Sequence, residues 1–312
     1  MAIAYISHRE CLQHDTGEGH PENARRISAI EDQMVATGLL DVLRYFDAPE
    51  VKESQLLRAH TRAHLDALQA MAPESGCARV DPDTIIGPGS LQAARRAAGA
   101  VVAAVDLVVS GEMESAFCCV RPPGHHAESN RAMGFCLYNN IAVGAAHALE
   151  EHGLKRVAIV DFDVHHGNGT EDIFKDDDRV LFCSTFQHPF YPFTALLDSA
   201  ANRVNVPLEA TAKSAEFRDA VSNHWLPALE AFQPEMVFVS AGFDAHRDDD
   251  MSNVSLVDAD FFWVTEQIVN VAANSASGRI VSTLEGGYEL RSLARCVELH
   301  IRAMMGLQPR HS

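Results

Sequence analysis

An apolar run that passes directly into carboxylates and imidazoles constrains this chain most. Residues 157–160, VAIV, predict a buried strand, and Asp161, Asp163 and His165 follow at once. Buried charges are costly unless they bind a metal or each other, and ligands of open α/β sheets collect at the C-terminal ends of strands. Because the three residues alternate, an extended chain would point them to one side. This pattern predicts a metal-binding face.

A simpler interpretation of the same segment is the start of a helix. Asn168 or Thr170 can act as an N-cap, with the aspartates accepting hydrogen bonds from loop amides. A cap needs one polar residue, whereas this run supplies five. We therefore favour a functional site over a cap alone.

The rest of the chain predicts one α/β domain over residues 1–312, because no linker or repeat divides it. Strand-like runs alternate with helix-like segments, which is typical of a parallel, doubly wound sheet with helices on both faces. Strands are expected at 2–6, 42–46, 117–120, 157–160, 179–184, 236–240 and 279–284. Helices are expected from residue 24, at 53–58, 61–71, 89–110 and 140–151, near residue 172, and at 214–232.

Charge and cysteine content narrow the class of protein. The chain has 25 basic and 43 acidic residues, and the net charge of −18 argues against a nucleic-acid-binding surface. Seven scattered cysteines without a CxxC motif are typical of reduced thiols in a cytoplasmic protein. We expect no signal peptide and no membrane span, since no apolar run approaches ~18 residues. Charge and cysteine content are compatible with a monomer and with a homo-oligomer.

Three further predicted strands also end in reactive residues. Residues 117–120 lead into a Pro-Pro-Gly loop that presents His125 and His126 on a stiff backbone. Asp244 follows strand 236–240, although the acidic run behind it is also compatible with a solvated face. Glu285-Gly286-Gly287-Tyr288 follows the last strand, and the paired glycines allow backbone to approach a ligand closely. By contrast, His60 and His64 have ligand spacing but no HExxH motif, and we expect no metal there.

These residue types together predict metal-dependent hydrolysis of an amide. Asp163, His165 and Asp244 offer two oxygens and one nitrogen, and three protein ligands with an open position are typical of catalytic zinc. His125 and His126 would transfer protons, and the Tyr288 hydroxyl would donate to a developing oxyanion. The sequence contains no GxSxG or Cys–His nucleophile motif that would compete with this interpretation.

The motifs resemble those of the histone deacetylase family, in its class II-like bacterial branch. They occur in the order RPPGHHA, GFCLYNN, DFDVHHGNGT, SAGFDAHRDDD and LEGGY, within a resemblance that runs from about His20 to Tyr288. The resemblance implies the arginase–deacetylase fold, a multi-stranded parallel sheet with helices on both faces. It also implies zinc-dependent removal of acyl groups from lysine or related amines.

The resemblance assigns roles position by position. Asp163, His165 and Asp244 match the zinc ligands, and Tyr288 matches the tyrosine that stabilises the transition state. The positions expected to bind substrate in the acyl-lysine tunnel are Gly134, Phe135, Tyr191, Met251, Gly286 and Gly287.

Two histidines have different expected roles. His126 matches the general base and acid, with Asn168 as its partner. His125 matches the neighbouring histidine, which the family holds with a buried acid matched here by Asp161.

The resemblance further implies two potassium sites. The first would use backbone oxygens of Asp161, Asp163, His165 and Thr185 with side chains of Asp161 and Ser184. The second would use the carbonyls of Phe174, Asp177, Val180 and Asn202.

The rim departs from the family pattern. The usual PGTG reads Pro-Phe-Thr-Ala at 192–195, Asp250-Met251 replaces Pro-Leu, and Asp83 matches the rim acid only loosely. Polyamine-selective relatives have glutamate at the Met251 position, so we expect acetyl-lysine or a simple acylated amine as substrate. An acetylpolyamine amidohydrolase, a two-manganese ureohydrolase and a non-catalytic metal-bound sensor are the alternatives.

Overall fold

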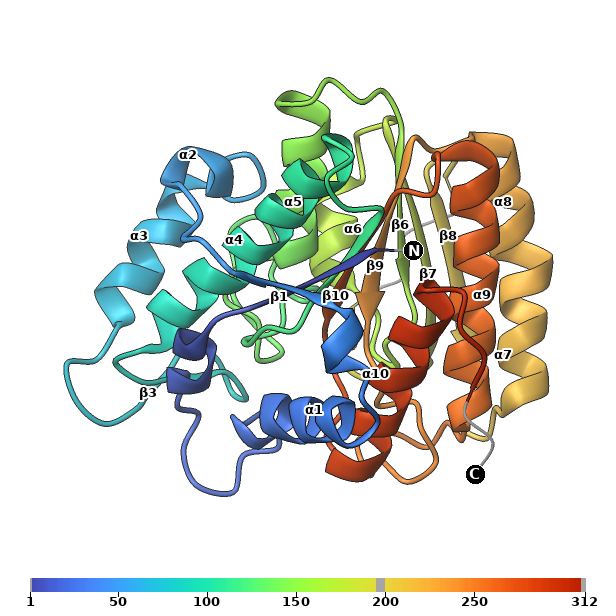
Figure 1. Ribbon diagram of the computed structural model, residues 1–312. Coiled ribbons are helices and arrows are strands. Elements are labelled where there is room, and N and C mark those ends of the chain that lie inside the picture. The colour runs from blue at the N-terminus through green and yellow to red at the C-terminus, as the bar shows by residue number, and fades with distance from the viewer. Residues whose placement is uncertain (1, 195–199, 310–312) are drawn as a thin grey trace.

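A parallel sheet of eight strands forms the centre of the computed structural model, which describes residues 2–194 and 200–309 (Figure 1). Its strands are β1 (Ile3–Ser7), β2 (Arg44–Asp47), β5 (Ser115–Cys118), β6 (Val157–Asp161), β7 (Val180–Gln187), β8 (Arg203–Leu208), β9 (Met236–Ala241) and β10 (Ile280–Leu284). Their spatial order is β2-β1-β5-β10-β9-β6-β7-β8, and every neighbouring pair is parallel. The predicted fold class is confirmed.

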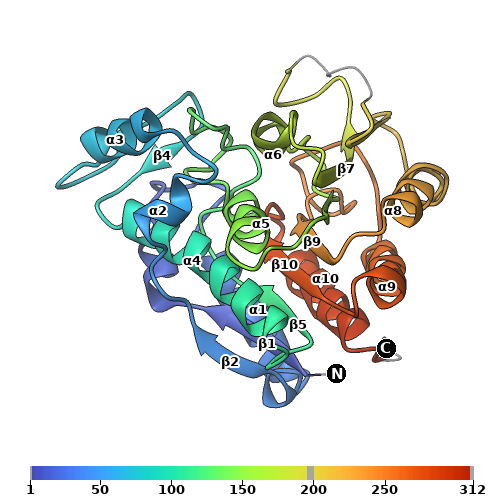
Figure 2. The same cartoon turned by 90° about the horizontal axis from the view of Figure 1, so that it is seen from above.

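Helices cover both faces of this sheet (Figure 2). On one face lie α4 (Ser90–Val109) and α5 (Asn140–Glu150), and on the other lie α9 (Asp258–Ser275) and α10 (Leu290–Met304). The remaining helices are α1 (Arg25–Ala36), which packs on α10, α2 (Glu53–Leu56), α3 (Arg62–Met71), α6 (Asn168–Phe174), α7 (Ser214–Ala220) and α8 (Leu226–Phe232). Short 3-10 turns span Arg9–Gln13 and Leu40–Val42, and β3 (Ala78–Arg79) pairs antiparallel with β4 (Ile85–Ile86).

Small residues allow the central helices to approach their neighbours closely. Helix α4 is rich in buried alanines, which cost little side-chain entropy on folding. A Cβ on its Gly99 would overlap the carbonyl oxygen of Pro49, so the loop before α2 can rest directly on the helix backbone. The strands between the helical layers are apolar and buried on both faces, as expected for a parallel sheet.

Several elements differ from the sequence-based expectations. The strand β8 and the short hairpin β3–β4 were not predicted, and the helix expected over 214–232 is interrupted by a π-helical turn, Val221–Trp225, with Pro227 at the start of α8. Strand β7 continues to Gln187, while β5 ends at Cys118. The sequence also predicts a proline- and aromatic-bearing loop from Gln187 to Leu197, and part of this range lies outside the described residues.

The seven cysteines are free thiols, and all but Cys77 are buried. Within residues 2–194 and 200–309, no helix is both long enough and apolar enough to cross a bilayer.

Candidate active site

Four adjacent strands carry the reactive motifs. Strands β5, β10, β9 and β6 are neighbours in the sheet, and each is followed by one of the polar segments that the sequence singled out. Because all four strands are parallel, their C-terminal ends meet at one edge, where open α/β sheets bind ligands. The residues come from four separate stretches of the sequence, around His126, Asp163, Asp244 and Tyr288, so only the strand order brings them together.

Asp163, His165 and Asp244 form a compact set of ligand atoms, all within 4.8 Å of one another. The Nδ1 atom of His165 lies 3.0 Å from Asp163 Oδ1 and 3.1 Å from Asp244 Oδ2. All three side chains are buried. One N–H cannot satisfy two buried carboxylates, whereas one divalent cation can bind both oxygens and the nitrogen. The donor set therefore fits a metal ion.

The charges in this cluster perturb each other strongly. Burial lowers the pKa of His165, but the Asp244 and Asp163 carboxylates outweigh it and raise the pKa to about 10. Burial and the neighbouring Asp163 charge raise the pKa of Asp244 to about 6. Such opposed shifts in one buried cluster are typical of functional sites.

Gly286 supports the ligand cluster from behind. Its backbone N–H donates to Asp163 Oδ2 at 2.8 Å, and a Cβ there would overlap the Asp244 carboxylate. Gly286 and Gly287, which were expected to bind substrate, are not among the residues that line the cavity described below. Gly287 instead has φ +115°, and its carbonyl accepts a hydrogen bond from Arg26 Nε at 2.7 Å.

Asp161 lies outside the ligand cluster, contrary to the expectation of one common face. Strand β6 ends at Asp161 and the chain then bends, so the alternation of an extended strand does not continue to Asp163 and His165. Asp161 Oδ2 instead pairs with His125 Nδ1 at 3.0 Å. Helix α6 does begin at Asn168, but the preceding residue is Gly167 and the aspartates face the site.

The two adjacent histidines are held in opposite charge states. Burial lowers the pKa of His125, but Asp163 and Asp161 raise it to about 10. Burial, together with the charges of His125 and His165, holds the pKa of His126 well below its usual range. His126 is therefore neutral beside a cationic neighbour, with ring centroids 4.0 Å apart.

Asn168 fixes the tautomer of His126. Its Nδ2 donates to Glu128 Oε1 at 2.9 Å, so its Oδ1 faces His126 Nδ1 at 2.8 Å as the acceptor. The proton of neutral His126 must then sit on Nδ1, which leaves the Nε2 lone pair free. A free imidazole nitrogen at this position can accept a proton from a reacting group.

A cavity of about 260 Å³ opens onto these residues. Its lining includes four predicted tunnel residues and five others: Gly134, Phe135, Tyr191 and Met251 with Asp83, His126, His165, Phe190 and Tyr288. Phe190 stacks on His165 with ring centroids 5.6 Å apart, and Tyr191 meets His126 edge-on at 5.2 Å. The cavity is thus lined by the aromatic rings of Phe135, Phe190, Tyr191 and Tyr288 together with the imidazoles of His126 and His165.

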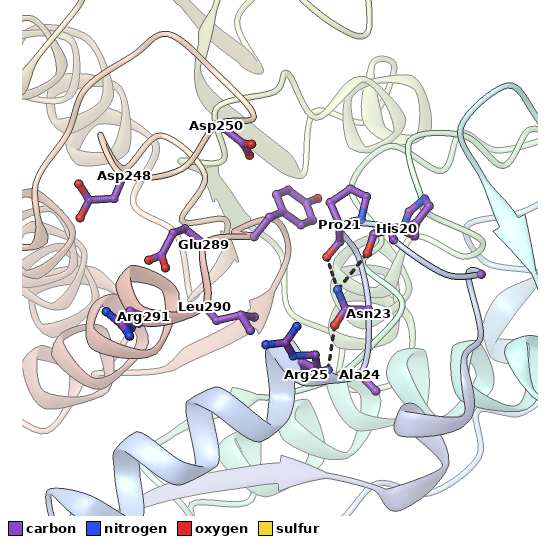
Figure 3. Close-up of a pocket in the computed structure, with 13 residues that line it drawn as sticks. His20, Pro21, Asn23, Ala24, Arg25, Asp248, Asp250, Glu289, Leu290 and Arg291 are labelled. Carbon is purple, nitrogen blue, oxygen red and sulfur yellow. Dashed lines mark hydrogen bonds between the residues drawn. The ribbon is translucent and has the colours of Figure 1, made fainter.

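Tyr288 lines two cavities. The guanidinium of Arg26 lies 4.9 Å from the centroid of its ring, and Phe135 meets the ring edge-on at 5.9 Å. Burial holds the Tyr288 pKa well above its usual range, so the hydroxyl is a neutral donor. A larger cavity of about 850 Å³ lies beside it, lined by residues that include Asp248, Asp250 and Glu289 (Figure 3).

The structure also places residues that sequence reasoning missed. Arg26 joins α1 to Glu22 and Arg121 in a buried network, since Glu22 Oε1 accepts from Arg26 Nη1 at 3.2 Å and Glu22 Oε2 accepts from Arg121 Nη2 at 2.7 Å. Glu285 accepts hydrogen bonds from the backbone N–H groups of Gly124 and His125. The only sequence signal for these residues was a charged residue inside a predicted helix or beside a strand end.

The residues of the first expected potassium site are partly adjacent. Asp161 and Ser184 are register partners on β6 and β7, and Asp161 Oδ1 accepts from the Asp163 backbone N–H at 3.1 Å. At the second, Asn202 Nδ2 donates to the carbonyl oxygens of Phe174 at 3.0 Å and Asp177 at 3.4 Å. An amide group therefore already serves two of the four carbonyls expected to bind a cation.

His60 and His64 have structural partners. His60 Nε2 accepts from the Asn139 backbone N–H at 2.9 Å, and its Nδ1 lies 3.0 Å from the Glu128 carbonyl oxygen. His64 Nε2 lies 2.8 Å from the carbonyl oxygen of Leu137. Backbone groups therefore contact both ring nitrogens of His60 and Nε2 of His64.

Comparison with known proteins shows similarity to the histone deacetylase family. A model of the histone deacetylase domain matches residues 20–304. The histone deacetylase-like amidohydrolase of Pseudomonas aeruginosa is 36% identical, over 95% of this chain and 80% of the relative. Type-2 histone deacetylase 2 of Dictyostelium discoideum is 34% identical over 96% of this chain, which spans a fifth of that larger protein.

The structure also matches a solved one, the crystal structure of the HDA15 HD domain. The TM-score is 0.92 at 33% sequence identity, and the match covers 99% of this chain and 91% of the other. The arginase–deacetylase fold implied by the sequence motifs is therefore confirmed.

Proposed function

Because the chain belongs to the histone deacetylase family, we propose that it is a zinc-dependent hydrolase that deacylates acetyl-lysine or a related small acylated amine. One observation carries this proposal: His165 of the Asp163–His165–Asp244 cluster, the neutral His126 and Tyr288 all line one cavity. A metal site, a proton acceptor and an oxyanion donor beside one cavity are the parts that amide hydrolysis needs.

Zinc held by Asp163, His165 and Asp244 would supply Lewis acidity to the substrate carbonyl and to the attacking water. His126 Nε2 takes the proton from this water, because its Nδ1–H is committed to Asn168. The same nitrogen then returns the proton to the leaving amine. The free lone pair and the neutral state of His126 both support this role.

Two fixed groups favour the negative charge that develops on the amide oxygen. The Tyr288 hydroxyl is a neutral donor, and a preorganised donor of this kind is worth a large factor in turnover. His125, held cationic by Asp161, places positive charge beside His126. That charge keeps His126 neutral before water attacks.

The walls of the cavity select the substrate class. Phe135, Phe190 and Tyr191 present aromatic surface, which suits an aliphatic stem such as that of lysine. Met251 at the lining adds an apolar side chain instead of the glutamate of polyamine-selective relatives. This residue supports acetyl-lysine or a simple acylated amine as the preferred substrate.

A second candidate, an acetylpolyamine amidohydrolase, is favoured by one specific feature. Asp248, Asp250 and Glu289 line the larger cavity (Figure 3), where they would attract the second amine of a polyamine; Tyr288 lines both cavities. Comparison of kcat/KM for acetylputrescine and for an acetyl-lysine peptide separates the two candidates.

A two-manganese ureohydrolase and a non-catalytic sensor are less well supported. In the described part of the chain, no second group of three ligand side chains shares a residue with the Asp163 cluster, so one metal fits better than a pair. A sensor would not need the ordered pair His125–His126 or the half-buried Tyr288. We also propose potassium beside Asp161 and Ser184, where a buried carboxylate and a hydroxyl are in register.

The experiment combines metal analysis with turnover of a fluorogenic acetyl-lysine peptide. We expect one tightly held zinc per chain, loss of turnover in a chelator and recovery with added zinc. Asp244→Ala should lose the zinc and remain folded by circular dichroism. Asp248→Ala, an acid in the same loop whose side chain is 48% exposed, should keep it.

Full turnover in chelator-treated, zinc-free protein would overturn the proposed chemistry. Equal zinc content in Asp244→Ala and wild type would overturn the ligand assignment. A metal-loaded, folded wild type that turns over none of a panel of acetyl-lysine peptides, acetylpolyamines and longer acyl amines would favour the sensor.

A further inference from the structure

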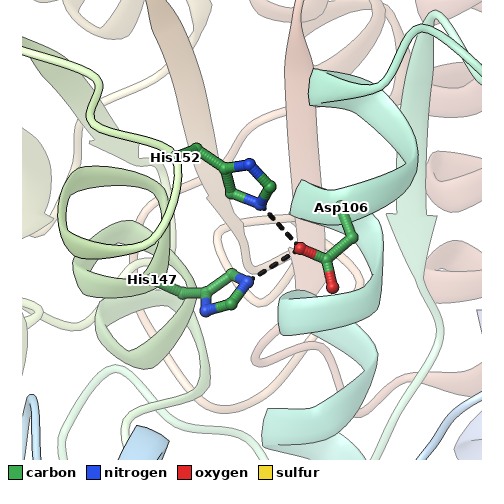
Figure 4. Close-up of side chains that lie close together, drawn as sticks. All are labelled: Asp106, His147 and His152. Atoms are coloured by element: carbon green, nitrogen blue, oxygen red, sulfur yellow. Dashed lines mark hydrogen bonds and ion pairs between the residues drawn. The ribbon is translucent and has the colours of Figure 1, made fainter.

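A second group of metal-ligand side chains lies between two helices on one face of the sheet. Asp106 belongs to α4, His147 to the last turn of α5, and His152 follows the end of that helix. Both histidines direct Nε2 at the same carboxylate oxygen, Asp106 Oδ1, at 2.8 Å and 2.7 Å (Figure 4). The three ligand atoms lie within 4.8 Å of one another, and the proposed deacylase chemistry uses none of them.

The group is both ordered and accessible. The His147 side chain is 4% exposed and His152 is 23% exposed, so packing holds the imidazoles. The Asp106 side chain is 54% exposed, which leaves room for an ion to approach from solvent. In a tetrahedral zinc site with bonds of about 2.1 Å the ligand atoms stand about 3.4 Å apart. Asp106 Oδ1, at 2.8 Å and 2.7 Å from the two Nε2 atoms, therefore needs to move away from each by only about 0.6–0.7 Å, and the half-exposed Asp106 can turn by that much.

Arg58 controls whether His147 is free to bind a metal. Its Nη1 donates to His147 Nδ1 at 2.8 Å, and its Nη2 donates to Glu151 Oε2 at 2.9 Å. With Nδ1 accepting, the proton of His147 must sit on Nε2, where it is donated to Asp106. A metal at Nε2 requires that proton on Nδ1, so Arg58 has to release His147. Glu151 can retain Arg58 when this happens.

The other comparable group is less suited to a cation. His246, Asp258 and Cys296 also bring three ligand atoms together. The Arg295 guanidinium, however, pairs with Asp258 Oδ2 at 2.8 Å, and burial holds the Cys296 thiol pKa well above its usual range. The carboxylate is neutralised and the thiolate is disfavoured, so this cluster holds itself together without an ion.

We propose that Asp106, His147 and His152 form a second cation site, which takes a divalent transition metal such as Zn²⁺ or Ni²⁺. Two imidazoles and one carboxylate suit these ions better than Mg²⁺ or Ca²⁺, which prefer oxygen ligands. The bound ion would join α4 to the end of α5 and stabilise the packing of the two helices. Arg58 competes with it for His147.

The test uses the holoenzyme with its tightly held zinc in place, freed of excess metal by gel filtration. Calorimetric titration with Zn²⁺ should show one further ion per wild-type chain and a rise in Tm. His152→Ala should lose both effects while keeping full turnover of the acetyl-lysine peptide. His224→Ala, which removes an exposed histidine elsewhere, should behave as wild type.

Arg58→Gln is expected to increase the affinity for Zn²⁺, whereas structural damage would decrease it. Removing the competing cation should tighten the binding of Zn²⁺ by about tenfold or more, the usual size of a change beside a metal ligand. No uptake beyond the first zinc in wild type, or equal uptake in His152→Ala, would overturn the proposal. Unchanged or weaker Zn²⁺ binding in Arg58→Gln would refute the competition.

Discussion

Replacement of Glu285 by glutamine tests the electrostatics beneath the histidine pair. The Glu285 carboxyl is fully buried, and its Oε2 accepts backbone N–H groups from Gly124 at 2.6 Å and His125 at 3.1 Å. Its Oε1 has no hydrogen-bond partner among the residues that the structure describes. Burial and the charge of Asp161 raise the pKa of Glu285 to about 7. Glutamine has the same shape and can accept the same two bonds, but it cannot titrate.

The raised pKa of Glu285 determines both the sign and the size of its contribution to the pH dependence of the unfolding free energy. Between its ordinary 4.5 and about 7, the folded chain keeps the Glu285 proton while the unfolded chain has lost it. The unfolded state then binds fewer protons, so this group's stabilisation is full below about pH 4.5 and is lost as pH rises through about 7. At ~1.36 kcal/mol per pKa unit, the loss amounts to about 3 kcal/mol.

Urea unfolding of the metal-free chain, repeated from about pH 4 to about pH 8, measures this term directly. Metal must be removed because a divalent cation near Asp163 would lower the Glu285 pKa. The unfolding free energy of Glu285→Gln minus that of wild type should increase by about 3 kcal/mol from the low to the high end of this pH range. Glu230→Gln, at an exposed position, should follow wild type. If wild type and Glu285→Gln show the same pH dependence, Glu285 does not titrate in this window and the argument fails.

Three substitutions in the cavity probe the chemistry and the substrate. Tyr288→Phe should keep the zinc and lower kcat by about 10²–10³, the usual loss for an oxyanion donor; near-normal kcat would remove that role. Gly134→Ala should cost about 1–2 kcal/mol of unfolding free energy in urea, because φ is +57°. It should also lower kcat, since the new Cβ would overlap the His126 ring, and unchanged kcat would show that the ring can yield. Met251→Glu should favour acetylputrescine over an acetyl-lysine peptide in kcat/KM by about 1–3 kcal/mol; a wild-type preference for acetylputrescine that this substitution leaves unchanged would show that another residue gates the rim.

The positions of the reactive groups could be predicted because each one directly follows an apolar run. Parallel strands bring their C-terminal ends to one edge, so Asp163, His165, Asp244 and Tyr288 were expected near one another before any strand order was known. The order β5-β10-β9-β6 could not be predicted, since it joins strands that are distant in sequence.

Details that depend on long-range contacts could not be predicted from local patterns in the sequence. The alternation of residues placed Asp161 beside Asp163, but this rule holds only in an extended strand and β6 ends at Asp161, which contacts His125 as the family resemblance implied. Strand β8 was missed because Asn205 and Pro207 are unusual in a strand, although an edge position tolerates proline. The buried roles of Arg26 and Glu285 arise from partners far along the chain, which no local pattern reveals.

The proposed turnover should depend on an intact sheet, because the reactive groups follow four interior strands, β5, β10, β9 and β6. These four strands are interior to the sheet, while β2 and β8 form its edges. Local opening begins at poorly packed margins and costs less free energy than disruption of the centre. Fraying of β2 or β8 would therefore leave the reactive groups assembled. The reactive groups would separate only if the central strands of the sheet unfolded. Turnover should persist through marginal fluctuations and disappear in one step with global unfolding, so residual activity in urea gives the native fraction directly.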